Sequence, residues 1–462
     1  MLKHILMAFC CLSLTVVFLS GCGGGGGGSA AVVAVPIVVN SLEDPLVPAQ
    51  GVITLRSALA AATSGQPIIF ASNLDGGVIS LTNVGEGSTE LKGEVMDMRI
   101  EPSGPVSFLV GYLARDYGAS ALYARKNVVI DASALPNGIT VEWAGATDAR
   151  VLAVYGNLNM TNVNITGGSS VAIDISATNA SQPWTLGRGG GVAVWGTAEL
   201  VGCKIYGNSC QGDFDSSRDR GAFGGGLYAD IVILNDCVIS GNTVLGGGAA
   251  GGGVYSVGGA DTTATQSTIT QCTISGNKIS ALFTYGGGVY SDGGGIGNRK
   301  LLHLTNCTVA RNLVEPPPGM PAFLLGMGYW RGGAVYASNG SVMIDACTIV
   351  ENEVIGLPRT DSLDRPNLAG GVACTVGNAH AVEELTVAQS IFAGNMVREL
   401  NGGGAIANSY NQDIFTGSLM YFISRGYNRV GVIQFSHILV PVGEPGWKSL
   451  CRRHFPKTGD TQ

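Results

Sequence analysis

The stretch of the chain with the most reactive side chains is "DFDSSRDR", residues 213–220. It places three carboxylates and two guanidinium groups within eight residues: Asp213, Asp215, Arg218, Asp219 and Arg220. Two carboxylates held a fixed distance apart can hydrolyse a glycosidic bond, one as the acid and the other as the base. An acidic cluster can also hold calcium. Mixed charges at this density are typical of a solvated loop, so we expect no cofactor here and treat these residues as candidates for binding a ligand.

Cys22 is a candidate for a different chemistry, the attachment of lipid. Lys3 and His4 precede an apolar run over residues 5–19, which is too short for a stable membrane span and is typical of a secretory signal. The run leads into "LSGC", which resembles the lipobox of bacterial lipoproteins; an ordinary signal with a chance cysteine is the alternative. We therefore predict a signal peptide over residues 1–21 and a membrane partner, held through acyl chains on Cys22.

The residues after Cys22 predict where the protein is held. Gly23, rather than an aspartate, follows the cysteine, which by resemblance to Gram-negative lipoproteins indicates the outer membrane. A run of glycines, Gly23–Gly28, then begins a flexible tether over residues 22–40. The tether would lift a folded body off the lipid surface. The sequence is compatible with either the cell-surface or the periplasmic face of the membrane.

A repeat organises the middle of the chain. Its asparagines lie 34, 35, 35, 40 and 43 residues apart, and they are Asn208, Asn242, Asn277, Asn312, Asn352 and Asn395. A small residue stands five positions before each asparagine: Cys203, Cys237, Cys272, Cys307, Cys347 and Ser390. Glycine-rich openings such as "GGGVYS" precede the copies. Spacing this regular is the sequence signature of a solenoid.

The residues within each copy predict strands. Apolar side chains alternate, as at Leu302 and Leu304, and threonine and valine are abundant. A copy this short cannot bury its own apolar face, but stacked parallel coils can, with each residue about 4.8 Å above its equivalent in the next coil. We therefore expect the cysteines to form a column of buried free thiols and the asparagines to stack their amides at a turn.

One short helix is predicted near the start of the repetitive body. Thr54 is a good N-cap, residues 55–62 are good helix formers, and Gly65 is a stop signal. A helix in this place would cover the open strand edges of the first coil, so its expected role is capping.

The repeat "GGGVYS…LTNCTVARN" resembles the repeats of right-handed parallel β-helix proteins, of the sort found in polymorphic outer-membrane proteins and many bacterial surface proteins. The opening "TLRSALAAATSGQPIIF" is similar to their N-terminal start, and "GYNRVG" (426–431) resembles the segment that closes such arrays. The likeness covers roughly residues 51–435. It implies an all-β fold, a right-handed parallel β-helix of roughly 9–10 coils with a short N-terminal capping helix.

The expected organisation follows from these motifs. After the signal peptide and the tether, we expect an N-terminal cap with the first coils over residues 41–125. The β-helix repeats should occupy residues 126–435, and a C-terminal tail or cap residues 436–462.

The resemblance leaves the function open, because this architecture carries adhesins, lyases, hydrolases and plain stalks. The hydrolases of this fold carry an Asp pair and a Gly-His-Gly, and neither "DD" nor "GHG" occurs here. The formal charge of −7 argues against a nucleic-acid partner. We expect an adhesion or binding scaffold on the outer membrane; a polysaccharide lyase or glycoside hydrolase, or a structural spacer, is the alternative.

Variation in repeat length predicts where a ligand binds. It falls after each asparagine and before the next glycines, over residues 209–223, 243–250, 278–285, 313–330, 353–368 and 396–401. Equivalent positions align in stacked coils, so these stretches should emerge as loops along one edge. Besides residues 213–220, the candidates on this edge are Tyr329, Trp330, Arg359, Asp361 and Asp364. Aromatic faces beside charged groups suit a polysaccharide or a cell-surface protein.

Overall fold

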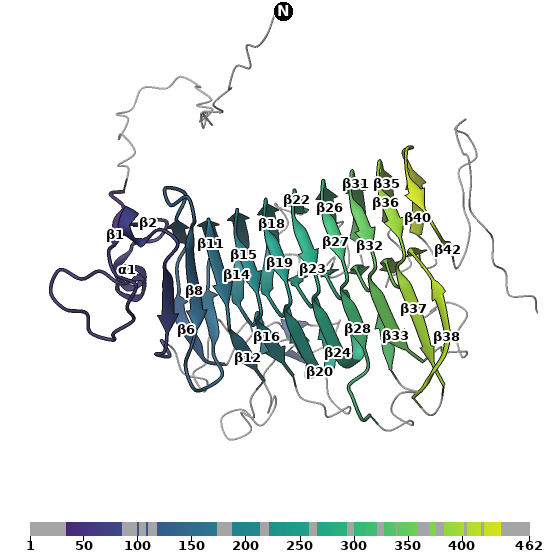
Figure 1. Ribbon diagram of the computed structural model, residues 1–462, viewed down its shortest axis with the longest axis horizontal. Helices are drawn as coiled ribbons and strands as arrows, with labels where there is room; N and C mark the ends of the chain where they lie inside the picture. Colours follow the sequence, from purple (N-terminus) through teal and green to yellow (C-terminus); the bar gives the residue numbers. More distant parts are fainter. Residues whose placement is uncertain are drawn as a thin grey trace, which may run out of the picture. The chain divides into compact units, whose positions relative to one another are not determined.

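The computed structural model is a parallel β-solenoid made of short strands. It describes residues 34–85, 99–100, 108–109, 118–172, 187–212, 221–257, 266–292, 300–320, 328–338, 340–357, 369–375, 383–401, 404–416 and 420–435. Strands of successive coils stack in register into three long sheets, and they follow one another in chain order from purple to yellow (Figure 1). The predicted all-β parallel solenoid is confirmed.

The first sheet contains nineteen strands, two in most coils. They are β1 (Ile37–Val39), β2 (Pro67–Phe70), β6 (Ser120–Ala124), β7 (Val128–Asp131), β9 (Arg150–Val154), β10 (Leu158–Thr161), β14 (Val192–Val201), β18 (Leu227–Asn235), β21 (Val254–Ser256), β22 (Gln266–Thr270), β25 (Val289–Asp292), β26 (Lys300–Thr305), β30 (Val335–Ser338), β31 (Gly340–Asp345), β34 (Val372–Thr375), β35 (Glu383–Ala388), β39 (Ile414–Thr416), β40 (Met420–Ser424) and β42 (Ile433–Phe435).

The second sheet contains ten strands, one for each coil. They are β3 (Val78–Leu81), β8 (Ile139–Trp143), β11 (Val163–Thr166), β15 (Lys204–Tyr206), β19 (Val238–Ser240), β23 (Thr273–Ser275), β27 (Thr308–Ala310), β32 (Thr348–Val350), β36 (Ile391–Ala393) and β41 (Arg429–Val430). The number of coils therefore agrees with the number that the sequence predicts.

The third sheet contains eleven strands and begins at the third coil. They are β12 (Ser169–Val171), β13 (Gly187–Arg188), β16 (Ser209–Gln211), β17 (Gly221–Phe223), β20 (Thr243–Ala250), β24 (Lys278–Tyr285), β28 (Leu313–Glu315), β29 (Tyr329–Arg331), β33 (Glu353–Gly356), β37 (Met396–Leu400) and β38 (Ile406–Asn411). β38 runs antiparallel to β37 and ends the sheet. β4 (Arg99–Ile100) and β5 (Phe108–Leu109) form a separate antiparallel pair.

The core of the solenoid is built from columns of like residues. In the first sheet Val192, Leu227, Val254 and Val289 lie opposite one another in successive coils, and each is fully buried. Because side chains alternate along a strand, the next residue in each of these strands points away from this core. The outward residues of the first sheet matter for the site described below.

The cysteines fill one corner of the coil, between the first and second sheets. Cys203, Cys237, Cys272, Cys307 and Cys347 are all buried and free. Their thiols donate hydrogen bonds to backbone carbonyls, and some also accept one from a backbone amide of the preceding coil. The amide of Cys237, for example, donates to Cys272 Sγ at 3.3 Å. Hydrogen bonding with the thiols of Cys237 and Cys307, together with burial, raises the pKa of Cys272 above its ordinary value.

The asparagines fill the corner between the second and third sheets. The side chains of Asn208, Asn242, Asn277, Asn312, Asn352 and Asn395 are buried and form a continuous column. Asn242 Nδ2, for example, donates to Asn277 Oδ1 at 2.9 Å and to the Ile205 carbonyl at 3.0 Å. Asn395 Nδ2 donates to the buried carboxylate of Asp413 at 2.7 Å. Each amide therefore has its partners, and all point in the same direction along the column.

A left-handed residue makes the turn before each cysteine. The position is occupied by Gly202, Asp236, Gln271, Asn306 and Ala346, with φ between 51° and 63°. Glycine and asparagine tolerate this conformation, whereas alanine is strained by its Cβ. Ala346 is therefore a point of local strain in the corner.

The predicted capping helix is present as α1 (Leu55–Ala61), which ends one residue earlier than expected. Thr54 is the N-cap, and its hydroxyl and that of Ser57 bond each other's backbone amides in a capping box. Leu55, Ala58 and Leu59 are buried in the core of the first coil. The helix thus covers the N-terminal end of the core.

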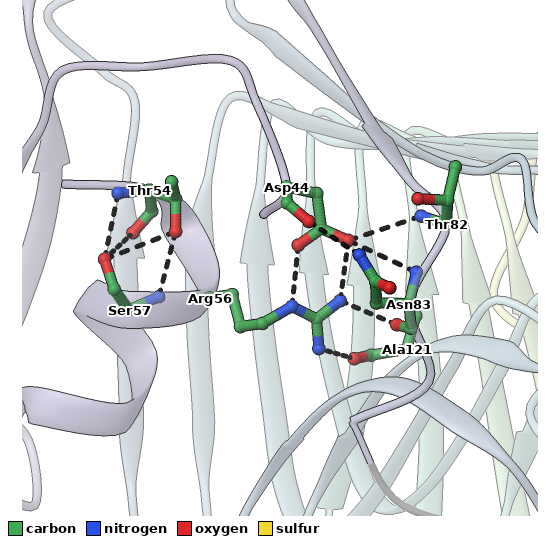
Figure 2. A network of polar contacts seen from close by, with 7 residues as sticks. All are labelled: Asp44, Thr54, Arg56, Ser57, Thr82, Asn83 and Ala121. Carbon is green, nitrogen blue, oxygen red and sulfur yellow. Dashed lines mark hydrogen bonds and ion pairs between the residues drawn. The ribbon is translucent and has the colours of Figure 1, made fainter. Parts of the chain in front are cut away.

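Arg56 fastens this helix to the rest of the cap, as Figure 2 shows. Its Nε and Nη2 donate to the two carboxylate oxygens of Asp44 at 2.6 and 2.8 Å. Two further bonds reach the carbonyls of Ala121 at 2.6 Å and Asn83 at 2.7 Å. The bidentate ion pair and the two bonds to carbonyls together tie three separate segments to the helix.

Candidate functional site

Inserted segments leave the third sheet at one register. β16 and β17 pair with the two halves of the continuous strand β20, and residues 213–220 are inserted between them. β28 and β29 pair in the same way with the two halves of β24, on either side of residues 316–328. The insertion after β12 begins at the same position in its coil, and the one after β33 begins one residue later. We call this row of insertion points the first insertion line.

Three of the predicted loops are strands. In the stretch 396–401, residues 396–400 form β37, which pairs with β33. Residues 243–250 form β20 and residues 278–285 form β24, and these two strands pair over their whole length. Ile279 and Ala281 are fully buried, so this part of the coil is a sheet with a core beneath it. These stretches are expected to be loops because repeat length varies after each asparagine, but in the shortest copies the same stretch pairs as a strand.

A second insertion line crosses the first sheet, where the sequence had predicted none. In β18, Ala229 and Ile233 are four residues apart, while their partners Ser256 and Thr268 are twelve apart. The eight extra residues are 258–265. Further breaks separate β25 from β26, β34 from β35 and β39 from β40. The prediction that length varies in only one place of the repeat is therefore wrong.

A row of aromatic rings lies between the two insertion lines, on the outward side of the first sheet. Tyr228, Tyr255, Tyr290 and Tyr336 pair in register, each next to a core valine or leucine. Their rings stack with centroids 5.4, 4.7 and 5.6 Å apart. The four side chains are only 3–9% exposed. We call this row the aromatic floor; stacked aromatic pairs stabilise packing beyond the apolar area that they bury.

The middle coils have a run of glycines between the third sheet and the first sheet, and the residue just before this run borders the aromatic floor on one side. This position holds Arg188, Phe223, Ala250, Tyr285 and Arg331 in successive coils. The guanidinium of Arg331 lies 5.8 Å from the Tyr285 ring and donates to the Tyr336 hydroxyl at 3.3 Å. Cations over aromatic faces strengthen the packing of this border.

Sequence reasoning missed the aromatic floor, although its signal is visible. A tyrosine follows the first apolar residue in "GGGLYA", twice in "GGGVYS" and again in "GGAVYAS". Read as a column, the recurrence predicts stacked rings on the side of the strand opposite the core.

Trp330 is not a surface residue, and its place among the ligand-binding candidates is corrected. The side chain is 0% exposed, and its Nε1 donates to the Ala281 carbonyl at 3.0 Å. Gly356 makes room for the indole, since a Cβ there would lie 2.5 Å from Cε3. β29 is a strand of the third sheet, so alternation turns the indole into the core beneath that sheet.

The other ligand-binding candidates stay predictions. Tyr329 begins β29, with its backbone opposite Phe283 at the first insertion line. The remaining candidates lie outside the described residues: Asp213, Asp215, Arg218, Asp219, Arg220, Arg359, Asp361 and Asp364. Cys22 also lies outside them, as does Cys451, while Cys210 and Cys374 are buried.

The described residues offer little for metal chemistry or for spanning a membrane. Among them, no three His, Cys, Asp or Glu side chains come together as a metal site. Within the same ranges, no helix has the length and apolar character to cross a bilayer. Comparisons of the chain with protein-family models, with curated proteins and with solved structures found no match.

Proposed function

We propose that the protein is a binding scaffold that holds an extended saccharide against the loops of its first insertion line. The observation that supports this proposal is the common register of the insertions in the third sheet. Loops that start from equivalent positions in stacked coils form a row with a repeat of about 4.8 Å per coil. A row of loops on a rigid support is suited to an elongated ligand.

The aromatic floor is proposed to support the loops rather than to contact the ligand. Its tyrosines are nearly covered, so they have little surface to offer a partner. The first-sheet strands that carry them follow, after a run of glycines, the third-sheet strands at which the inserted segments end, and the stacking stabilises that part of the coil. The contacts themselves are proposed to come from residues 213–220, from Tyr329, and from Arg359, Asp361 and Asp364.

The scaffold is further proposed to be anchored at the outer membrane through lipid on Cys22. The glycines that follow this cysteine would let the solenoid reach ligands at a distance from the bilayer. A lipid-anchored protein with a row of binding loops fits the role of an adhesin.

The structure supplies the design of a test. In β24, Ser280 pairs with Glu315 and Phe283 pairs with Tyr329, so only two residues lie between the paired positions. Residues 316–328 can therefore be replaced by a two-residue link such as Ala-Leu. Residues 212–220 can likewise be replaced by Gly-Gly, following β20. We expect a chain carrying both changes to keep its strand content by circular dichroism and to lose most of its binding to a glycan array and to cells.

The matched control removes an insertion of similar size from the other line. Deleting residues 258–265 leaves three residues between Ser256 and Thr268, as between Ala229 and Ile233 in β18. This variant should bind like the parent chain. Equal loss in both variants would move the binding surface away from the first line, and a parent chain that binds no glycan and no cell would make the solenoid a spacer.

A further inference from the structure

Two arginines, two aromatic rings and one hydroxyl form a closed circuit of contacts beside the aromatic floor. Ser170 Oγ accepts hydrogen bonds from Arg150 Nη2 at 3.0 Å and from the Arg188 amide at 3.1 Å. Arg188 Cζ lies 5.5 Å from the centre of the Tyr228 ring, and Arg150 Cζ lies 5.9 Å from that of Trp195. The Trp195 and Tyr228 rings, 5.9 Å apart, close the circuit. We call these five residues the arginine circuit.

The circuit is rich in buried hydrogen-bond donors. Arg150 is 0% exposed and Arg188 is 8% exposed. Nε and Nη1 of Arg188 and Nε1 of Trp195 are buried, and none of the three has a hydrogen-bond partner in the part of the chain that the structure describes. All three groups are N–H donors, so what they lack is an acceptor.

A buried guanidinium with unused donors is costly. Taking a charged group out of water without a compensating partner destabilises a fold by several kcal/mol. Unsatisfied buried polar groups are rare in native proteins, and a missing water or ion is a common explanation. Ser170 joins the guanidinium of Arg150 to the backbone amide of Arg188, and the positive charge of a guanidinium favours an anion over a neutral acceptor such as water.

We propose that the arginine circuit binds an oxyanion, the acidic group of a saccharide. The planar fork of a guanidinium matches the two oxygens of a carboxylate or sulfate group. The neighbouring indole of Trp195, which is only partly buried, provides apolar surface of the kind that a sugar ring can pack against. The inference rests on the proposed function for the identity of the ligand and names its class as acidic glycans.

The circuit has a natural control within the same column. Arg331 stands at the equivalent position of a later coil, is also 8% exposed and also lies over a tyrosine ring, but it donates to the Tyr336 hydroxyl. Arg188→Met and Arg331→Met remove the same group from matching surroundings. Only the first should affect an oxyanion site.

The test titrates the purified full-length chain with inorganic sulfate, phosphate and acetate at constant ionic strength, and with acidic and neutral oligosaccharides of equal length. Thermal unfolding and calorimetry report the site directly. We expect oxyanions to raise the Tm of the parent chain and of Arg331→Met, and acidic oligosaccharides to bind more tightly than neutral ones. Arg188→Met should weaken oxyanion binding about ten- to a hundredfold.

The outcomes separate the site from the function. Arg188→Met should also unfold at a higher temperature than the parent chain when no oxyanion is present, because it removes an uncompensated buried charge. If sulfate, phosphate and acetate bind but no oligosaccharide does, the site stands and the proposed function fails. If acidic glycans bind equally well to Arg188→Met, the function stands and this inference is wrong. If Arg188→Met has a lower Tm and the parent chain does not respond to any oxyanion, the charge is balanced within the protein and the inference is overturned.

Discussion

Single residues in the corners of the coil carry much of the specificity of this fold. The spacing of cysteine and asparagine alone predicts two columns, and the structure places buried thiols and bonded amides in them. What the spacing cannot show is how each column ends. Asp413 ends the asparagine column, because its carboxylate accepts a hydrogen bond from the side-chain amide of Asn395. It is not an asparagine, so the spacing of the asparagines does not identify it.

The thiol column should make the protein sensitive to alkaline pH. The pKa of Cys272 is higher in the folded chain than its ordinary value of 9.0, so the folded state holds this proton more tightly than the unfolded state. The resulting stability is complete below pH 9 and is lost as the pH rises above it. Denaturant unfolding at a series of pH values should show this loss, with a shallower slope for Cys272→Ser. Parallel profiles for the two proteins would contradict the assignment.

The strained corner residue Ala346 can be relieved. With φ at 51°, it lies in a region that disfavours alanine by about 1–2 kcal/mol. Ala346→Gly should raise the free energy of unfolding by about 0.5–1 kcal/mol, after the added freedom of glycine in the unfolded chain is subtracted. Chemical denaturation measures this change. Ala393→Gly, in strand β36, is the control and should lower stability; a loss at both positions would mean that the corner is not strained.

At the scale of elements, periodicity predicted the strands that face the core and failed for those of the third sheet. "TVLGGGAA" in β20 lacks alternation and is rich in glycine, yet the strands on both sides give it a complete set of backbone partners. Tertiary pairing overrides weak local propensity in such a segment. The capping helix was predicted almost to the residue because its signals, Thr54 and the apolar face, are local.

The clamp on the capping helix gives a prediction at this scale. Asp44 is 3% exposed and Arg56 is 14% exposed at the side chain, and they form a bidentate pair. Asp44→Asn leaves a buried guanidinium partly uncompensated and should lower the free energy of unfolding by about 3 kcal/mol. The control is Glu351→Gln, which breaks the 3.6 Å pair with Arg311 on the exposed surface and should change it by less than about 0.5 kcal/mol. Similar losses in urea unfolding would show that the clamp is not special.

For the whole molecule, the sequence predicted the solenoid, its number of coils and the row of insertions now proposed to bind a ligand, but neither the aromatic floor nor the second insertion line. Stacking follows from a period, and a period can be read directly from the spacing of asparagines. The aromatic floor and the second insertion line depend on which side of a strand a residue faces and on which strands pair. Those facts become visible only when the register between coils is known.

The anchor is tested at the level of the whole molecule. Expressed in a Gram-negative host, the protein should incorporate labelled palmitate and fractionate with the outer membrane. Cys22→Ala should abolish both, while leaving thermal unfolding of the solenoid unchanged, because Cys22 precedes the first described residue, residue 34. Labelling that persists in Cys22→Ala, or a parent chain that takes up no lipid, would rule out this cysteine as the site.

The asparagine column also determines how such a chain can change its length over generations. Asn242 donates to Asn277 and Asn277 donates to Asn312, each 35 residues further on, so neighbouring members are interchangeable as donors and acceptors. Loss or duplication of residues 243–277 would rejoin the column without an orphaned amide, and Asp413 would still terminate it. A gain or loss of half a coil would leave amides facing the wrong sheet. Genes of this kind should therefore vary by whole coils, with the two ends held constant.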